Sequence, residues 1–191
     1  MNKMAVKWIS RWFQKTGWKF VGKLPKRLYK SIIVTGPHTS YTDYMLWIAV
    51  KKLARIDADI FVPHHEFKFP FTLLLKVAKA KKYQAGEEQK LGELLSKKFE
   101  ESSRYTAIVF AEKSMERNDD LNDFFFDCAQ KSKVPLVYVA LDYERKNVKF
   151  HTHFFPTENK KEALGFLRRF LSTYRGKHPE KGVFRTPGGR I

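Results

Sequence analysis

The sequence is poor in cysteine and acidic residues, and it lacks long apolar runs. A single cysteine, Cys128, occurs among 191 residues. One thiol excludes an internal disulfide and is typical of a reducing compartment. The longest apolar runs, such as residues 44–50, are far shorter than the roughly 20 residues that cross a bilayer. We therefore expect no membrane-spanning helix.

Basic residues greatly outnumber the acidic ones. Lysine and arginine total 37 against 20 aspartates and glutamates, which gives a formal net charge of +17. Such a balance indicates an anionic partner, which could be nucleic acid, an anionic membrane or a phosphorylated substrate. Hydrophobic residues make up 43% of the chain, which argues against disorder. A chain of this length can form one domain with a sizeable core.

Residues 1–17 predict an amphipathic helix that lies in a membrane interface. One face carries aromatic and apolar side chains at helical spacing: Ala5, Trp8, Ile9, Trp12 and Phe13. The other face carries Lys3, Lys7, Arg11 and Lys15, which also interrupt any apolar stretch of a signal peptide. This pattern fits an anionic membrane surface, with contacts through Trp8, Trp12, Phe13, Lys7 and Arg11. The alternative is that the aromatic face packs on the protein's own core.

Strand and helix signals alternate along residues 18–175. Strands are predicted at 30–36, 58–63, 105–111, 134–143 and 147–155, and helices at 42–53, 71–80, 87–103, 119–131 and 160–174. The alternation predicts a single α/β domain, a sandwich with a mostly parallel central sheet flanked by helices. Residues 176–191 hold several glycines and basic residues, and we expect a flexible basic tail there.

His38 and Asp43 follow the first predicted buried strand. Gly36 and Pro37 end that strand, so His38 lies in a turn and Asp43 in the start of the next helix. A chain reversal there can bring the imidazole onto the carboxylate. Asp43 would then orient His38, and the free ring nitrogen could remove a proton from a hydroxyl. The pair alone is a weak motif, so the neighbouring sequence must support it.

The segment "PHTSYTD" (37–43) resembles the His-(x)4-Asp block of the glycerolipid acyltransferase family, whose best-known members acylate lysophosphatidate. Three further segments resemble the family's other blocks, in the right order. "EFKFPF" (66–71) is similar to the second block, "IVFAEKS" (108–114) to the third and "VPLVYVALDY" (134–143) to the fourth. The resemblance covers roughly residues 18–160.

The resemblance implies an acyltransferase-like fold in which His38, held by Asp43, deprotonates the hydroxyl of a lysophospholipid or a related lipid. The acyl donor would be acyl-CoA or an acyl carrier protein, with no cofactor and no metal. Acceptor contacts are implied for Phe67, Pro70, Glu112, Ser114 and Arg117, with Lys82 supplying charge. The implied location is cytoplasmic, peripheral on the inner face of the cell membrane.

Departures from the family pattern keep other hypotheses open. Ala111, Lys113 and Met115 stand where the third block has proline, glycine and arginine, and Ala85 lies near the place of a phosphate-binding arginine. A non-catalytic descendant that binds lipid or a partner through the same groove is therefore the alternative. A basic nucleic-acid binder is a third hypothesis, but we find no nucleic-acid motif and expect no such partner.

Overall fold

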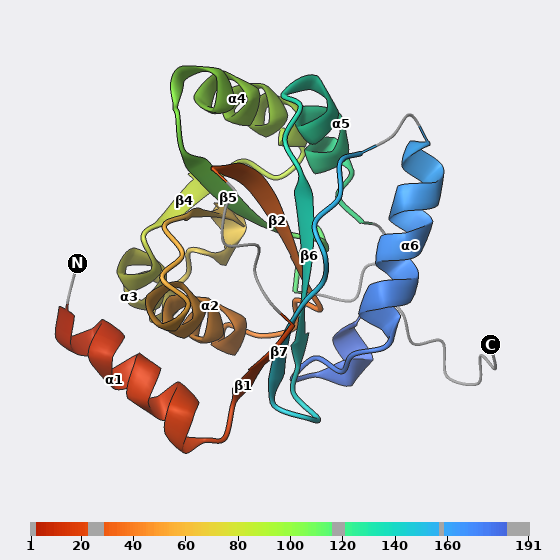
Figure 1. Ribbon diagram of the computed structural model, residues 1–191. Coiled ribbons are helices and arrows are strands. Elements are labelled where there is room, and N and C mark those ends of the chain that lie inside the picture. The colour runs from red at the N-terminus through yellow and green to blue at the C-terminus, as the bar shows by residue number, and fades with distance from the viewer. Residues whose placement is uncertain (1–2, 23–28, 116–120, 157–158, 183–191) are drawn as a thin grey trace.

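In a computed structural model, the chain is described over residues 3–22, 29–115, 121–156 and 159–182. These residues form a seven-stranded, mostly parallel sheet between two layers of helices (Figure 1). The alternation of strand and helix signals predicted this α/β class, because each crossover between parallel strands needs a helix.

The sheet has its most buried strands in the middle. The strands are β1 (Lys19–Val21), β2 (Lys30–Gly36), β3 (Asp59–Pro63), β4 (Ala80–Tyr83), β5 (Tyr105–Phe110), β6 (Leu136–Asp142) and β7 (Asn147–Phe150). They lie in the order β1-β7-β6-β2-β5-β3-β4. Neighbours are parallel except β6 and β7, which are antiparallel. Every residue of β6 is buried, as expected for a central strand covered on both faces.

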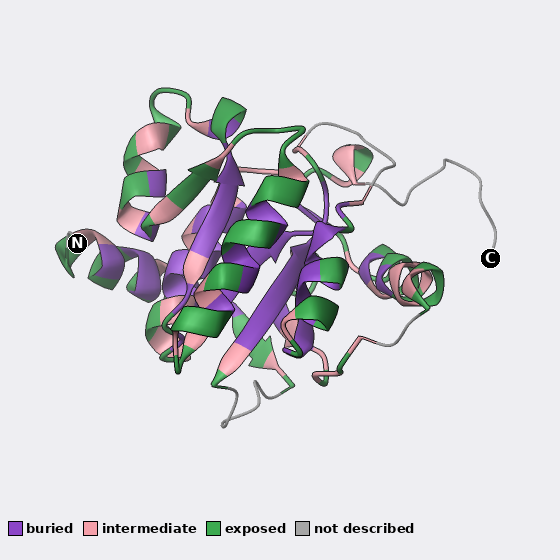
Figure 2. Cartoon of the chain, turned by 90° about the horizontal axis from the view of Figure 1, so that it is seen from above, coloured by how far each residue is buried: buried purple, intermediate pink, exposed green. Residues whose placement is uncertain are grey.

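Three helices cover each face of the sheet. α1 (Lys3–Lys15), α2 (Thr42–Leu53) and α3 (Phe71–Ala78) share one apolar core, and α4 (Glu88–Glu101), α5 (Phe124–Lys131) and α6 (Lys160–Ser172) share the other. Neighbouring strand residues alternate between the cores, so Ile33 joins the first and Ile32 and Val34 the second. The buried faces of the helices turn toward the strands (Figure 2). None of the described helices is long and apolar enough to span a bilayer.

Most predicted elements are present, with differences at their ends. The helix expected at 71–80 ends at Ala78, because Lys79 has a left-handed backbone (φ 55°) and Ala80 begins β4. The strand expected over 147–155 ends at Phe150. The helix expected over 119–131 begins at Phe124, and residues 116–120 lie outside the described part of the chain.

The prediction that α1 contacts a membrane through Phe13 is wrong. Phe13 is 2% exposed and stacks on Phe20 with 5.2 Å between ring centroids. Val6 and Ile9 are buried beside it, so the alternative of core packing holds for this face. The buried stripe, formed by Val6, Ile9, Ser10 and Phe13, is shifted by one residue position from the predicted stripe, which leaves Trp8 outside it.

The remaining membrane candidates of α1 face outward or lie at its edge. Trp8 is 64% exposed, and Lys7 and Arg11 are also exposed. Trp12 is partly buried against the core. Of the five predicted membrane contacts, Trp8, Lys7 and Arg11 therefore remain on the outward face of α1.

The start of the expected flexible tail is instead held against the domain. The ammonium of Lys177 donates to the hydroxyl of Thr42 over 2.7 Å, and the backbone N–H of His178 donates to the hydroxyl of Thr39 over 3.2 Å. A short 3-10 helix, η2 (Pro179–Lys181), follows. The prediction is thus wrong for residues 176–182, while residues 183–191 lie outside the described chain.

Candidate active site

Four strands deliver polar side chains to one edge of the sheet. His38 follows β2, Glu66 ends the 3-10 helix η1 (His64–Glu66) after β3, Glu112 follows β5, and Tyr143 follows β6. Because these four strands are parallel, their carboxyl ends meet at this edge, where ligands bind in α/β sheets.

The expected contact between His38 and Asp43 is present. Nδ1 of His38 lies 3.1 Å from Oδ2 of Asp43. The same oxygen accepts the backbone N–H groups of Thr39 and Ser40, at 2.9 and 3.0 Å. The other oxygen accepts the hydroxyl of Tyr143 over 2.5 Å. The carboxylate is therefore fixed from both sides, and it orients the imidazole through Nδ1.

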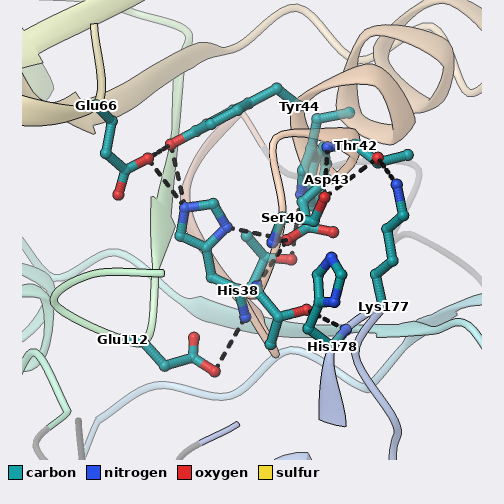
Figure 3. Close-up of polar contacts among 12 residues, drawn as sticks. His38, Ser40, Thr42, Asp43, Tyr44, Glu66, Glu112, Lys177 and His178 are labelled. Carbon is teal, nitrogen blue, oxygen red and sulfur yellow. Dashed lines mark hydrogen bonds and ion pairs between the residues drawn. The ribbon is translucent and has the colours of Figure 1, made fainter. Parts of the chain in front are cut away.

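The second ring nitrogen is occupied, so the expectation of a free nitrogen is wrong for this state. Nε2 of His38 lies 3.1 Å from the hydroxyl of Tyr44 and 3.2 Å from Oε2 of Glu66. The Tyr44 hydroxyl also donates to that Glu66 oxygen in a short hydrogen bond. Figure 3 shows Glu66 and Asp43 on opposite sides of the ring.

The carboxylates keep the buried ring charged. Burial lowers the pKa of His38, but the charge of Glu66 and the hydrogen bonds that the ring donates to Asp43 and Glu66 outweigh it and raise that pKa to about 10. Burial raises the pKa of Glu66, but the charge of His38 outweighs this and the pKa is lowered on balance. Near neutral pH the described state therefore holds an imidazolium between two carboxylates.

Glu112 lies buried beneath the turn that carries His38. It is 2% exposed, and its Oε1 accepts the backbone N–H of His38 over 3.1 Å. Burial raises the pKa of Glu112 to about 7, against the opposing influence of His38. In this structure the Glu112 side chain supports the backbone of His38, and the acceptor-binding role implied for it stays a prediction.

A cleft of about 590 Å³ opens beside the pair. Glu66 lines this cleft and also touches Nε2, so it connects the cleft to His38. His38 itself is 1% exposed. The cleft walls combine apolar residues, namely Met45, Phe69, Phe71, Leu74 and Met115, with the cations Lys68, Lys177 and Lys181.

The residues predicted to contact the acceptor are only partly brought together. Ser114 lines the cleft. Phe67 and Pro70 lie between residues that line it, and Lys82 on β4 lies over the ring of Phe67, 4.5 Å from its centroid. These three do not line the cleft. Arg117 lies outside the described residues.

Two parts of the site were not predicted from the sequence. Lys177 and Lys181 belong to the segment that was expected to be a tail. Glu66 was not predicted as a site residue, although its position three residues after the end of a predicted strand is the available signal. Across the described residues, no group of three or more His, Cys, Asp or Glu side chains is arranged to hold a metal ion.

A scan against protein-family models finds no match to this chain, and a search of curated proteins finds no significant match. Function is therefore inferred from the geometry of the site and from the order of the sequence blocks.

Proposed function

We propose that this protein is an acyltransferase that moves a fatty acyl group from the thioester of acyl-CoA or an acyl carrier protein to a hydroxyl of a membrane lipid. The observation that carries the proposal is the buried contact of 3.1 Å between His38 and Asp43 at the carboxyl edge of the sheet. The sequence blocks similar to the acyltransferase family converge on this pair. The second block supplies Glu66, the third Glu112 and the fourth Tyr143.

In the proposed reaction, neutral His38 takes the proton of the acceptor hydroxyl on Nε2 as the alcohol oxygen bonds to the thioester carbonyl carbon. Asp43 stabilises the imidazolium that forms. The C–S bond then breaks, and the departing sulfur takes the proton from Nε2. The products are an ester and a free thiol, with no covalent bond between the protein and the acyl group.

The lining of the cleft suits an amphiphilic acceptor with an anionic head group. Phe69, Phe71 and Leu74 offer apolar contacts, whereas Lys177 and Lys181 offer positive charge. Pockets of this kind bind through apolar walls and orient a ligand through a few polar groups. In this proposal the cations are Lys68 and, from the C-terminal segment, Lys177 and Lys181, and not Lys82.

Exposed apolar side chains near basic residues support a peripheral position on the anionic inner face of the cell membrane. Phe69 is 94% exposed at the cleft, and Leu73, four residues further on, is 71% exposed. On α1, Met4 and Trp8 are 80% and 64% exposed beside the basic face. Aromatic and aliphatic side chains flanked by lysines bind anionic lipid surfaces.

The test is transfer of a labelled acyl group from acyl-CoA or acyl carrier protein to a panel of lysolipids by the purified protein. We expect His38→Gln to lower the rate by about 100- to 10,000-fold, because it removes the general base. His151→Gln, which changes a histidine in contact with Phe166 and Phe170, is the control and should retain the rate. Failure of the folded protein with every donor and acceptor would contradict the proposal.

One observation favours a second candidate, a lipid-binding protein without turnover. His38 is almost fully buried and its Nε2 is occupied in the described state. If the protein only binds lipid, the wild type and His38→Gln should bind lysolipid with equal affinity, and neither should form product.

A further inference from the structure

We propose that Glu66 is a gate for His38: its carboxylate occupies the place on Nε2 that the acceptor hydroxyl must take, and it withdraws when an acceptor enters the cleft. Glu66 is thus a positioning residue. The identity of the entering hydroxyl rests on the proposed acyl transfer, whereas the gate itself rests on the contacts of Glu66.

The two oxygens of Glu66 have unequal surroundings. Oε2 lies 3.2 Å from Nε2 of His38 and accepts the hydroxyl of Tyr44. Oε1 is buried and has no hydrogen-bond partner among the described residues; Nε2 of His65 is 4.0 Å away. A buried carboxylate oxygen without a donor is costly. The carboxylate therefore gains from a rotation that gives both of its oxygens partners.

The backbone of Glu66 is held, so the movement belongs to the side chain. Its carbonyl oxygen accepts the hydroxyl of Tyr41 over 3.0 Å and the N–H of Lys68 over 2.9 Å. The ring of Tyr41 stacks on Phe71 with 3.7 Å between centroids. Because Glu66 already lines the cleft, a rotation of its side chain carries the carboxylate outward. Lys68 and His65 line the same space, where their side chains can pair with the Glu66 carboxylate.

Withdrawal of Glu66 changes the protonation state of the His38 ring. The groups that face His38 are Asp43 and Tyr44 from α2, Glu66 from η1, and Glu112 at its backbone N–H. Among the influences that raise the pKa of His38, the charge of Glu66 is the largest. When this charge leaves, the Nε2–H bond breaks, the proton passes to water in the cleft, and the nitrogen keeps the lone pair. The neutral ring can then accept the proton of a hydroxyl.

The direct test is an NMR titration of the His38 ring without substrate, in the wild type and in Glu66→Gln. Glutamine keeps the shape of the side chain and removes its charge. We expect the titration midpoint of the His38 ring to fall by about one pH unit or more in Glu66→Gln, because the ring loses a negative charge with which it is in contact. Glu112→Gln is the matched control, since that carboxylate touches only the backbone of His38, and its shift should be less than half as large. An unchanged midpoint in Glu66→Gln would overturn the gate.

A second variant and an activity measurement separate the gate from the acyl transfer. Glu66→Asp keeps the charge but shortens the side chain, and should lower the midpoint less than Glu66→Gln does. In acyl transfer, the pH profile of kcat/KM for Glu66→Gln should move to lower pH by the amount seen in the titration. A fall in rate at every pH with an unmoved profile would contradict the gate. A lowered midpoint in a protein that transfers no acyl group would support the gate and refute the enzyme proposal.

Discussion

Gly36, the last residue of β2, packs between the site residue Glu112 and the core residue Leu171. A Cβ atom at this position would be 2.8 Å from Oε2 of Glu112 and 3.1 Å from Cδ1 of Leu171. Both neighbours are buried: Glu112 lies under His38, and Leu171 is on the buried face of α6 in the second core. Any side chain here would displace the carboxylate that holds the backbone of His38, or would push α6 away from the sheet.

We therefore expect Gly36→Ala to lower the free energy of unfolding by about 1–3 kcal/mol, the usual cost of overpacking a core. Gly165→Ala in α6 is the matched control, because its Cβ would meet only the end of the Arg169 side chain, at 3.6 Å. The control should gain roughly 0.5–1 kcal/mol from its higher helix propensity. Urea unfolding of both variants measures the difference, and equal stabilities would refute this account of Gly36.

The hydroxyl of Tyr143 donates to Oδ1 of Asp43, and we expect this hydrogen bond to contribute to catalysis. Tyr143→Phe removes a donor at 2.5 Å. A hydrogen bond to a charged group contributes about 1.5–3 kcal/mol. If the full amount is lost in the transition state, kcat/KM falls roughly 10- to 150-fold. Tyr138→Phe is the control, because that hydroxyl makes only a 3.5 Å contact with the carbonyl of Ala163. Equal rates in the two variants would show that Tyr143 does not position the pair.

At the scale of elements, sequence patterns located α2 better than α1. The predicted helix over 42–53 matches α2 at both ends, because Gly36 and Pro37 break the chain before it and Arg55 takes a left-handed backbone (φ 55°) after it. Helical spacing also predicted a helix in α1. It did not indicate which stripe is buried, since tryptophan and phenylalanine suit a core and a membrane equally well.

The contact between His38 and Glu66 could not be predicted from local patterns. The two residues are 28 positions apart, and their strands β2 and β3 are not neighbours, because β5 lies between them. Strand order depends on how whole crossovers pack, whereas the turn that joins His38 to Asp43 is set by six consecutive residues. This is why the sequence predicted one partner of the ring and missed the other.

The segment from Phe69 to Leu73 gives a prediction for membrane binding. Phe69→Ser combined with Leu73→Ser should weaken binding to phosphatidylcholine vesicles that contain phosphatidylglycerol by about tenfold or more. Burying even one large apolar side chain is worth roughly 1.5–3 kcal/mol. Leu94→Ser on α4, where the side chain is 48% exposed, is the control. Trp8→Ser tests α1 separately. Cosedimentation measures each variant, and a pair variant that binds like the control would show that this segment does not meet the lipid.

At the scale of the whole molecule, a strongly basic chain buries three carboxylates around one histidine. The chain carries a net charge of +17, yet Asp43, Glu66 and Glu112 are buried around His38 with exposures of at most 2%. Burying charges is expensive unless they are paired. The imidazolium supplies the compensating charge within this cluster, so the protonation of one ring is linked to the stability of the fold.

This linkage predicts that the protein becomes less stable as the pH rises above neutral. The pKa of His38 is about 10 in the folded protein against an ordinary value of 6.5. The folded state thus binds the proton more tightly, and the resulting stabilisation is complete below pH 6.5 and lost as the pH rises toward 10. The free energy of unfolding should fall by up to about 1.4 kcal/mol per pH unit within this window, the limit for one proton.

Urea unfolding at intervals from about pH 6.5 to about pH 9 measures this slope, below the range in which ordinary tyrosines and lysines titrate. Glu66→Gln should flatten it, because the charge that contributes most to the raised pKa of His38 is absent. Its own stability near pH 6.5 should be lower, since the imidazolium then has one carboxylate in contact instead of two. A wild-type protein equally stable across the range would show that the ring is not held as an imidazolium, and a slope unchanged in Glu66→Gln would assign the bound proton to another group.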